Sequence, residues 1–473
     1  MGYTRAVSWN RREVLGGLGI ASASLLLGCH LPQPVETKPL APSDAIRGWL
    51  RDAVGWLAPG FASVHALAVT RRRTVAAIDG LGSGVSRSRF DGVVLSVRDK
   101  AGRREQITSD LTQAGVGRAI LLLAGTTNRA ARLSFGGAPV IVAPKLKGDP
   151  RLLDDRALIA RVITTDTTTS RIVYTAGLLE IDDTTTWSIA PDHDREQRIV
   201  RVRRTATRVA WNGTRPVVGE SSIAWAGGID DRVLTLAELH AATLGATELM
   251  TPGSFPEGER ELLLDPSVTA AAVDAMARTL FTAEAQRRPE LARRAAIVAP
   301  MLELVDDPTT PHAYGGFAFD DAGALAAPVT LLGRTSSTLG AGRERRPGGV
   351  GRLAAMPSHL RLGASDGDPG NMLIDGFALE GGGRVVLDPS SDRIAISVAR
   401  ARELARGATT GRVFADVELV GTLTGLLAST SGLSRETRAF GLREDIDGEP
   451  TWRSIETPWL RCRGSVRTRK GAA

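Results

Sequence analysis

The hydrophobic pattern over the first hundred residues changes from a helical period to an alternating one. Apolar residues three to four positions apart predict a helix over residues 45–57. Alternation then predicts strands at 64–69 and 73–78, on either side of an arginine-rich turn at 71–73. A further alternating segment follows at 92–97. Together these segments indicate a small antiparallel sheet next to a helix.

The middle of the chain repeats this alternation over longer stretches. After a predicted helix at 110–123, the clearest strands are residues 171–174, 186–189 and 199–203. Val209 and Trp211 continue the alternation, and Asn212-Gly213 is a favourable pair for a tight turn. A long meander with one polar face fits this stretch.

The last half of the chain contains the most amphipathic segment, residues 269–290, for which we predict a helix. Its apolar stripe is Val273, Met276, Ala277, Leu280 and Phe281. A helix is also predicted at 232–244, and after Pro300 the sequence becomes glycine-rich, with strands and one more helix near 392–406. We find no internal repeat.

The pattern predicts an α+β fold with mixed and antiparallel sheets and packed helices. We divide it into an N-terminal α/β region at 45–150, a middle β-meander at 151–230 and a C-terminal domain at 231–473. The chain has 473 residues, of which 42% are hydrophobic, so there is ample apolar material for a core.

The N-terminus has the features of an export signal. Arg11 and Arg12 precede an apolar run at 14–27 that is too short to span a bilayer, which predicts a twin-arginine signal. The run ends Leu-Leu-Gly-Cys and resembles a bacterial lipobox, with Cys29 as the lipidated residue. We therefore expect a signal at 1–29, a proline-rich tether at 30–44, and a periplasmic lipoprotein anchored to the membrane. A plain signal with a buried cysteine, or a wrongly assigned start site, is the alternative.

The basic composition does not favour nucleic acid as a partner. The net charge is +7, but lysine supplies only five of the 59 positive side chains, and the arginines are scattered. Aromatic residues are 4% of the chain, so stacking platforms beside the arginines are missing. The two cysteines allow no disulfide framework if Cys29 is lipidated.

Familiar catalytic motifs are absent from the sequence. No two of the six histidines lie within thirty residues of each other, so a His-Glu-x-x-His helix cannot form. Gly-x-Ser-x-Gly and the phosphate-binding loop are also missing. The acidic pairs at 306–307 and 320–321 are more typical of turns and caps than of acid–base catalysis, and Cys462 is more typical of a structural cysteine than of a reactive one.

The order of short motifs in the last third resembles the TldD/PmbA (TldE) family. The motifs are Val-Asp-Asp-Pro-Thr at 305–309, Gly-Gly-Phe-Ala-Phe-Asp-Asp-Ala-Gly at 315–323, Thr-Leu-Leu-Gly at 330–333, Ser-His-Leu at 358–360, Leu-Val-Gly-Thr-Leu at 419–423, Pro-Thr-Trp at 450–452 and Thr-Pro at 457–458. With the paired strands around 71–73 and the meander through Trp187 and Trp211, the resemblance covers roughly residues 45–464.

This resemblance implies a pair of unlike subunits. The TldD-like member is a zinc peptidase with a His-Glu-x-x-x-His helix and a later cysteine ligand, and the PmbA (TldE) member lacks these ligands. In this chain Asp274 occupies the position of the first histidine, Ala275 that of the glutamate and Thr279 that of the second histidine. Residues 440–443, where the late cysteine is expected, contain no cysteine. The resemblance therefore implies no catalytic residue and no metal in this chain, with zinc in a TldD-like partner.

We expect the chain to be a catalytically silent TldE-like subunit of an exported heteromeric peptidase that cuts unfolded peptides. The resemblance implies that peptide binds as an added strand, and we take the glycine-rich segment as the groove candidate: Gly315, Gly316, Phe317, Phe319 and Asp320. One alternative is an enzyme whose metal is held by His312, His359 and a carboxylate. The other is a non-enzymatic envelope lipoprotein on the same fold.

Overall fold

The computed structural model describes most of the chain after the N-terminal signal. The described residues are 42–124, 138–162, 171–211, 216–248, 255–282, 287, 302–333, 339, 342–388, 390–446 and 449–469. The predictions for Arg11, Arg12, Cys29 and the Asn212-Gly213 turn lie outside these residues, as does nearly all of the 30–44 tether. Within the described ranges no helix is long and apolar enough to cross a membrane.

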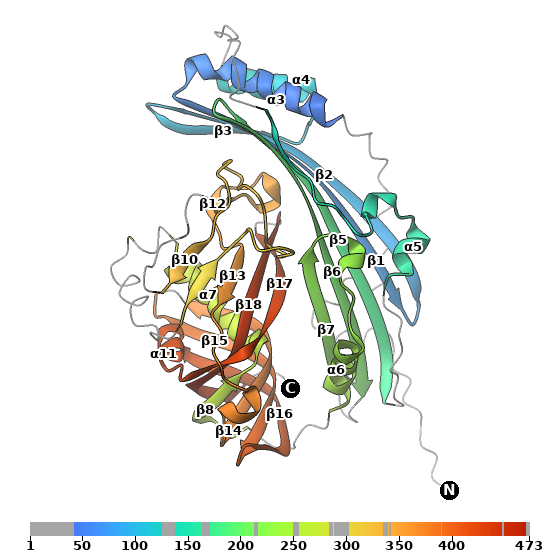
Figure 1. Ribbon diagram of the computed structural model, residues 1–473, viewed down its shortest axis with the longest axis vertical. Helices are drawn as coiled ribbons and strands as arrows, with labels where there is room; N and C mark the ends of the chain where they lie inside the picture. The colour runs from blue at the N-terminus through green and yellow to red at the C-terminus, as the bar shows by residue number, and fades with distance from the viewer. Residues whose placement is uncertain are drawn as a thin grey trace.

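The first half of the chain forms a long, curved sheet of seven strands (Figure 1). The order is β3-β2-β1-β5-β6-β4, and β7 pairs with a different stretch of β6. Only β4 runs parallel to its neighbour. The strands are β1 (Ser63–Asp79), β2 (Gly82–Asp99), β3 (Gly102–Thr108), β4 (Val140–Val142), β5 (Ile172–Ala190), β6 (His193–Trp211) and β7 (Pro216–Ala226).

The predicted arginine-rich turn at 71–73 is wrong. Residues 63–79 form one continuous strand, in which Arg71 pairs with Phe90 on one side and with Thr184 on the other. Arginines are tolerated inside this long strand because neighbouring strands supply carboxylates that pair with them. Glu180 on β5, for instance, accepts a hydrogen bond from Arg73 at 2.8 Å.

Helices cover parts of this sheet. At one end lie the two predicted helices, α3 (Ser43–Leu57) on β1 and α4 (Gln113–Ala124) on β2, and Ile46, Leu50 and Val54 are fully buried there. At the other end α6 (Leu236–Thr247) packs on β7. The remaining helical turns of this half are α5 (Asp155–Ile159), η1 (Ala58–Gly60), η2 (Pro150–Leu152) and η3 (Ile229–Asp231).

The second half forms a nine-stranded mixed sheet that lies beside the concave side of the first (Figure 1). Its order is β10-β9-β13-β18-β16-β15-β14-β8, β17 pairs with β18, and β8 also pairs with β18. The strands are β8 (Gly258–Leu264), β9 (Leu304–Asp306), β10 (Val329–Leu332), β13 (His359–Leu362), β14 (Gly376–Asp388), β15 (Arg393–Ala405), β16 (Ala408–Thr422), β17 (Gly432–Ile446) and β18 (Glu449–Thr468).

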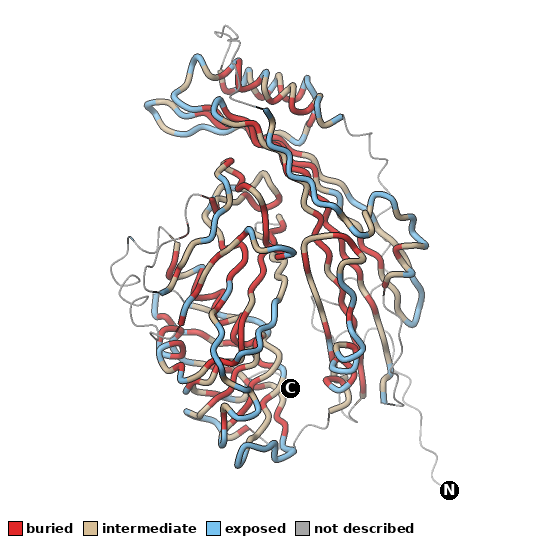
Figure 2. The backbone as a smooth tube through the Cα atoms, in the orientation of Figure 1, coloured by how far each residue is buried: buried red, intermediate tan, exposed pale blue. Residues whose placement is uncertain are grey.

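The largest hydrophobic core surrounds α7 (Pro266–Leu280) in this half, and Figure 2 shows the buried backbone that encloses it. The helix begins at Asp265, whose carboxylate accepts a hydrogen bond from the Val268 amide at 2.8 Å. Smaller elements are α10 (Pro369–Met372), α11 (Leu423–Ala428), η4 (Pro347–Gly349) and the paired strands β11 (Glu344–Arg345) and β12 (Ala354–Ala355).

Two predictions for this half are wrong. Residues 392–406 form the strand β15 and not a helix, because Ile394, Ile396 and Val398 alternate into the core with period two. The segment 315–320 is largely irregular and not a strand, apart from an isolated bridge between Phe319 and Leu325. The predicted α+β class with antiparallel and mixed sheets is confirmed.

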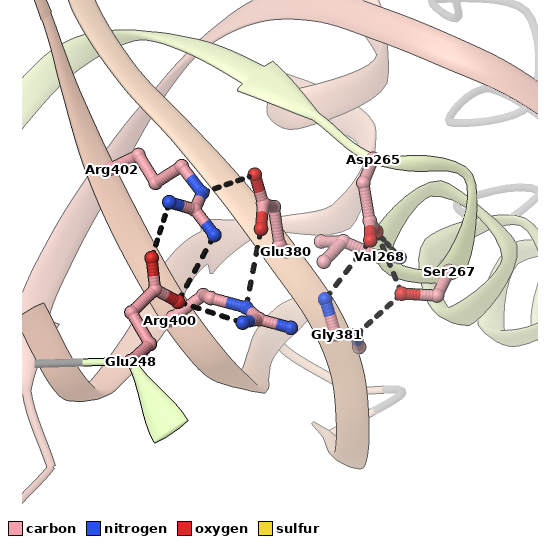
Figure 3. A network of polar contacts seen from close by, with 9 residues as sticks. Glu248, Asp265, Ser267, Val268, Glu380, Gly381, Arg400 and Arg402 are labelled. Carbon is pink, nitrogen blue, oxygen red and sulfur yellow. Dashed lines mark hydrogen bonds and ion pairs between the residues drawn. The ribbon is translucent and has the colours of Figure 1, made fainter. Parts of the chain in front are cut away.

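A polar network joins the two sheets (Figure 3). Glu248, at the end of α6, accepts hydrogen bonds from Arg400 and Arg402 on β15, the first at 2.8 Å. Both arginines also pair with Glu380 on β14, at 3.2 and 2.9 Å. The first half is therefore held to the second in part by charged side chains that are half-buried.

Candidate functional site

The helix that the resemblance assigns to zinc, α7, is packed as a structural helix. Val273, Met276, Ala277 and Leu280 are fully buried in the main core. Asp274, Ala275 and Thr279 lie on it as the sequence register requires. Asp274 and Ala275 are buried, and Thr279 is half-buried.

Asp274 takes part in a cluster of ion pairs. One carboxylate oxygen, Oδ2, lies 2.8 Å from Arg278 one turn along the helix and 3.4 Å from Arg453 on β18. Glu444 on β17 completes the cluster, 2.9 Å from Arg453 and 3.4 Å from Arg278. Two guanidinium groups thus stand beside the position of the first zinc ligand in the resemblance.

The two histidines of the alternative metal site are held separately. His359 is buried on β13, its Nδ1 lies 2.8 Å from the hydroxyl of Ser454, and burial lowers its pKa. His312 is exposed, and its Nδ1 lies 3.1 Å from the Ala226 carbonyl oxygen. Across the described ranges, no three His, Cys, Asp or Glu side chains gather in a way that would hold a metal ion.

The acidic pairs serve as anchors for loops. Asp306 pairs with Arg343 at 2.7 Å, and both side chains are fully buried. Asp320 accepts hydrogen bonds from the amides of Ala324 and Glu344 at 2.8 and 3.0 Å, and burial raises its pKa. The contacts of Asp320, and those of Asp307 with Thr309, agree with the interpretation of the pairs as turn and cap residues, whereas Asp306 forms a buried long-range ion pair.

The predicted peptide groove is occupied by the chain itself. Gly315, Gly316, Phe317, Phe319 and Asp320 are all buried. Their amide N–H groups are already bonded: that of Gly315 donates to Ser454 Oγ at 3.1 Å and that of Phe317 to the Pro308 carbonyl at 3.1 Å. A peptide cannot add here as a strand because no main-chain donor is open to it.

This loop nevertheless borders a cavity of about 530 Å³ between the two halves. Gly316 and Phe317 contribute one wall, and His312 lies in the same lining. The opposite wall consists of residues of β6, of Val142 at the end of the edge strand β4, and of Pro144 and Lys145, which follow that strand. The groove candidates thus border a cavity but do not form a strand edge.

The structure brings together two histidines that the sequence kept far apart. The hydroxyl of Ser188 lies 2.8 Å from Nε2 of His65 and 3.0 Å from Nε2 of His193, and Asp192 lies 3.0 Å from Nδ1 of His193. Both histidines line a cavity of about 710 Å³. Ser188 itself is fully buried, with the backbone of Gly323 above it, so its hydroxyl is not presented to that cavity.

The contact of His65 and His193 with Ser188 could not be predicted from the sequence, because it depends on the register in which the strands pair. His65 lies opposite Ser96 on β2, and on the other side β1 and β5 pair so that Ser188 is its diagonal neighbour. Only a known register identifies such neighbours.

Comparison with solved structures finds the same architecture in several proteins, including the following three. A proposed modulator of DNA gyrase from Thermotoga maritima superposes with a TM-score of 0.70, over 85% of this chain and 96% of its own, at 12% identity. A second proposed gyrase modulator, from Bacteroides thetaiotaomicron, has a TM-score of 0.65 over 90% and 98%, at 13% identity. TldE from Thermococcus kodakarensis has a TM-score of 0.63 over 89% and 100%, at 15% identity.

The chain has the TldD/PmbA-type fold. The predicted resemblance is thereby confirmed at the level of the fold. No protein-family model matches the sequence, and no curated protein matches it.

The zinc site of a TldD-like subunit does not fit the residues of this chain. Catalytic zinc takes three protein ligands and leaves one position for water. Here Ala275 has no donor atom, Thr279 offers a neutral hydroxyl, and the carboxylate of Asp274 already faces two guanidinium groups. The late cysteine is missing from β17, and burial of Cys462 on β18 raises the pKa of its thiol to about 12.

Proposed function

We propose that this protein is the non-catalytic, TldE-like subunit of an exported heteromeric zinc peptidase that cuts unfolded peptides. The zinc and the catalytic residues belong to a TldD-like partner. The proposal rests mainly on the ion-pair cluster of Asp274, Arg278, Arg453 and Glu444. According to the resemblance, this cluster occupies the place at which a TldD-like subunit binds its metal.

The cluster supports a silent subunit for an electrostatic reason. A zinc ion lowers the pKa of its bound water and so supplies the nucleophile for hydrolysis. In this chain the carboxylate of Asp274 is already paired with Arg278 and Arg453, and a guanidinium has no free lone pair with which to bind a metal ion. Without a glutamate at position 275, the helix also lacks a general base.

What the chain contributes is a wall of the peptide chamber. The cavity of about 530 Å³ beside Gly316, Phe317 and His312 lies between the two halves and is the candidate surface for an unfolded peptide. Export through Arg11 and Arg12, and a lipid on Cys29, would hold the assembly at the periplasmic face of a membrane.

The test is purification with and without the partner. We expect the chain, solubilised from native membranes with detergent, to bring down a protein with a His-Glu-x-x-x-His motif, and zinc and chelator-sensitive peptide cleavage to appear only in that complex. Recovery of the chain with no such partner would favour a non-enzymatic lipoprotein. Stoichiometric zinc in the isolated chain would contradict the proposal.

A variant of this chain tests whether Asp274 has a structural or a catalytic role. Replacing Asp274 with alanine leaves the buried guanidinium of Arg453 with Glu444 as its remaining carboxylate, so the variant tests the packing of α7 and not a metal ligand. We expect this variant to lose stability but to retain full peptidase activity per assembled complex. Loss of activity in a fully assembled, correctly folded complex would show that Asp274 has a direct catalytic role.

A further inference from the structure

A small buried cavity lies where the second half covers the first sheet. Its floor consists of side chains on the same face of three neighbouring strands, because Arg71 on β1 pairs with Thr184 on β5, and Thr184 with Ile199 on β6. Its roof comes from the second half, including Trp452, Gly348 and Gly349. The cavity measures about 20 Å³, which is room for one water-sized species.

The walls of this cavity are rich in positive charge. Four arginines line it, and three of them have a carboxylate partner: Arg71 lies 3.6 Å from Glu449, Arg345 lies 3.4 Å from Asp321, and Arg346 donates to Glu105 at 3.0 Å. The fourth is Arg201.

Arg201 is a buried cation without an ion pair. Its side chain donates to the carbonyl oxygens of Tyr314 and Gly316 at 2.8 and 3.2 Å, and its guanidinium lies 4.8 Å from the ring of Trp452. Among the described residues no carboxylate lies within ion-pair distance of it. Burial lowers the pKa of Arg201 to about 9, which is the cost of holding this charge away from water.

The neighbouring carboxylate, Asp182, does not pair with it. Asp182 lies directly opposite Arg201 in the register of β5 and β6. One of its oxygens accepts a hydrogen bond from Trp452 Nε1 at 3.2 Å, and the other has no partner. Burial raises the pKa of Asp182, so its negative charge is also held at a cost.

Three polar groups around the cavity lack a hydrogen-bond partner. The hydroxyl of Thr184, Nη1 of Arg71 and Nε of Arg346 are all buried, and none is bonded within the described part of the chain. Thr184 is only 8% exposed. A buried polar group is normally hydrogen-bonded, and a species bound in this cavity would offer an acceptor to these residues of its lining.

From these observations we propose that the cavity binds one small monovalent inorganic anion, chloride being the abundant example, which balances Arg201 and accepts hydrogen bonds from Thr184 and Arg71. The size of the cavity excludes sulfate, phosphate and any peptide carboxylate with its carbon chain. The anion would lie between the first sheet, which supplies Arg201, Thr184 and Arg71, and the roof supplied by the second half. This inference does not depend on the proposed peptidase role.

The experiment uses bromide as the probe. We expect the melting temperature of the purified protein to fall when chloride is replaced by gluconate at constant ionic strength, and to recover in a saturable way on addition of bromide. Crystals grown in sodium bromide are expected to show an anomalous peak in the cavity next to Arg201.

Two variants locate the effect. Thr184→Val removes one hydrogen bond to the anion, and we expect the bromide affinity to fall about tenfold. Thr205→Val is the matched control: Thr205 is a buried threonine on β6 that bonds Ser222 at 3.2 Å and is not part of the cavity lining, so its halide response is expected to equal that of the parent.

A melting temperature that does not depend on halide, together with an empty anomalous map, would overturn the proposal. Arg201 would then be balanced by Asp182 through space, and the cavity would hold water. An equal loss of bromide affinity in Thr184→Val and Thr205→Val would overturn the assignment of the site.

Discussion

Asp306, in the Val-Asp-Asp-Pro-Thr motif at 305–309, holds three segments together through its buried carboxylate. Its carboxylate accepts hydrogen bonds from the amides of Ser358 and His359, at 2.9 and 2.8 Å, besides the ion pair with Arg343. Three segments that are distant in sequence thus meet on one side chain. Removal of one partner of such a pair leaves the other charge buried and uncompensated.

We predict that Arg343→Met lowers the free energy of unfolding by about 3–5 kcal/mol, because it leaves Asp306 buried without its cation. The control is Arg467→Met, in which a half-exposed arginine loses its ion pair with Glu418, and we expect a loss below about 1 kcal/mol. Urea denaturation of both variants measures the difference. Equal losses would show that the buried pair is no stronger than a surface pair.

His65 gives a prediction for pH. Burial, followed by the nearby His193 and then Arg346 and Arg103, lowers the pKa of His65 from 6.5 to about 3, although Glu105 acts in the opposite sense. The unfolded chain therefore binds a proton below pH 6.5 that the folded chain does not bind. Stability is fully present above pH 6.5 and falls as the pH drops from 6.5 towards 3, by up to about 1.4 kcal/mol per pH unit for this one residue.

The variant His65→Gln removes the titrating group and is expected to flatten the loss of unfolding free energy between pH 6.5 and pH 4.5. Exposed His240→Gln serves as the control and is expected to keep the slope of the parent. Denaturant titrations at several pH values measure the slopes. A parental slope in His65→Gln would mean that His65 is already protonated in the folded protein.

Single residues were predictable where their role is local. The acidic pairs at 306–307 and 320–321 were predicted to be turn or cap residues, and the hydrogen bonds of Asp307 to Thr309 and of Asp320 to Ala324 agree with this. Arg201 was not predictable, because its partners are two carbonyl oxygens more than a hundred residues away. The ion pair of Asp274 with Arg453, 179 residues away, was not predictable either, whereas its pair with Arg278 has the i,i+4 spacing of a helix.

At the scale of elements, the turn at Gly315 determines how closely the loop can approach β13. A Cβ atom at this position would lie 1.9 Å from the Ser358 carbonyl oxygen and 2.8 Å from the Cα of Arg453. Both contacts involve backbone atoms, which cannot move aside without shifting a strand. Glycine is therefore required at position 315 by close approach.

We predict that Gly315→Ala destabilises the protein by about 1–3 kcal/mol through overpacking. Gly117→Ala is the matched control: the same added methyl group on α4 meets no atom within 4 Å, and alanine is expected to stabilise the helix by about 1 kcal/mol. In thermal unfolding, the melting temperature is expected to fall in Gly315→Ala and to rise in Gly117→Ala. Destabilisation of the two variants by the same amount would refute the close-approach argument.

Helices with a clear apolar stripe were the most predictable elements. The predictions at 45–57 and 110–123 match α3 and α4, and the helix predicted from residue 269 begins at Pro266 behind the cap of Asp265. Strands rich in arginine were mistaken for a turn at 71–73 and for a helix at 392–406. In these strands the arginines pair with carboxylates that are distant in the sequence, as Arg400 pairs with Glu248. The local pattern of hydrophobic and polar residues does not indicate such pairs.

At the scale of the whole molecule, the two sheets depend on polar contacts for their arrangement. Glu248 links the end of α6 to Arg400 and Arg402, and Glu380 holds the same two arginines from the other side (Figure 3). All four side chains are less than one-third exposed. This cluster is one of several polar contacts between the halves; another is the hydrogen bond from Arg201 to the Tyr314 carbonyl oxygen.

We predict that Glu248→Ala loosens the contact between the halves and lowers the free energy of unfolding by about 1.5–3 kcal/mol, since two charged hydrogen-bond donors lose an acceptor. Hydrogen exchange is expected to accelerate in α6 and β15. Glu403→Ala, which breaks an ion pair with Arg412 between neighbouring strands, is the control and should leave α6 protected. Unchanged exchange of α6 in Glu248→Ala would show that this cluster is not needed.

The fold class was predictable from the sequence, and the arrangement of the two halves was not. The alternation and the helical stripes report local burial, which is enough for the α+β class. The position of one sheet on the other depends on contacts such as that between Trp452 and Asp182, which are 270 residues apart. Fold likeness at 12–15% identity supplies the architecture but leaves the chemistry to the residues themselves.

The most direct measurement is the zinc content and peptidase activity of the purified chain, alone and in complex with a TldD-like partner, on an unfolded peptide. We predict substoichiometric zinc and no cleavage for the chain alone, and one zinc per pair with chelator-sensitive cleavage for the complex. A chain that binds one zinc and cleaves peptide on its own would contradict the assignment of a silent subunit.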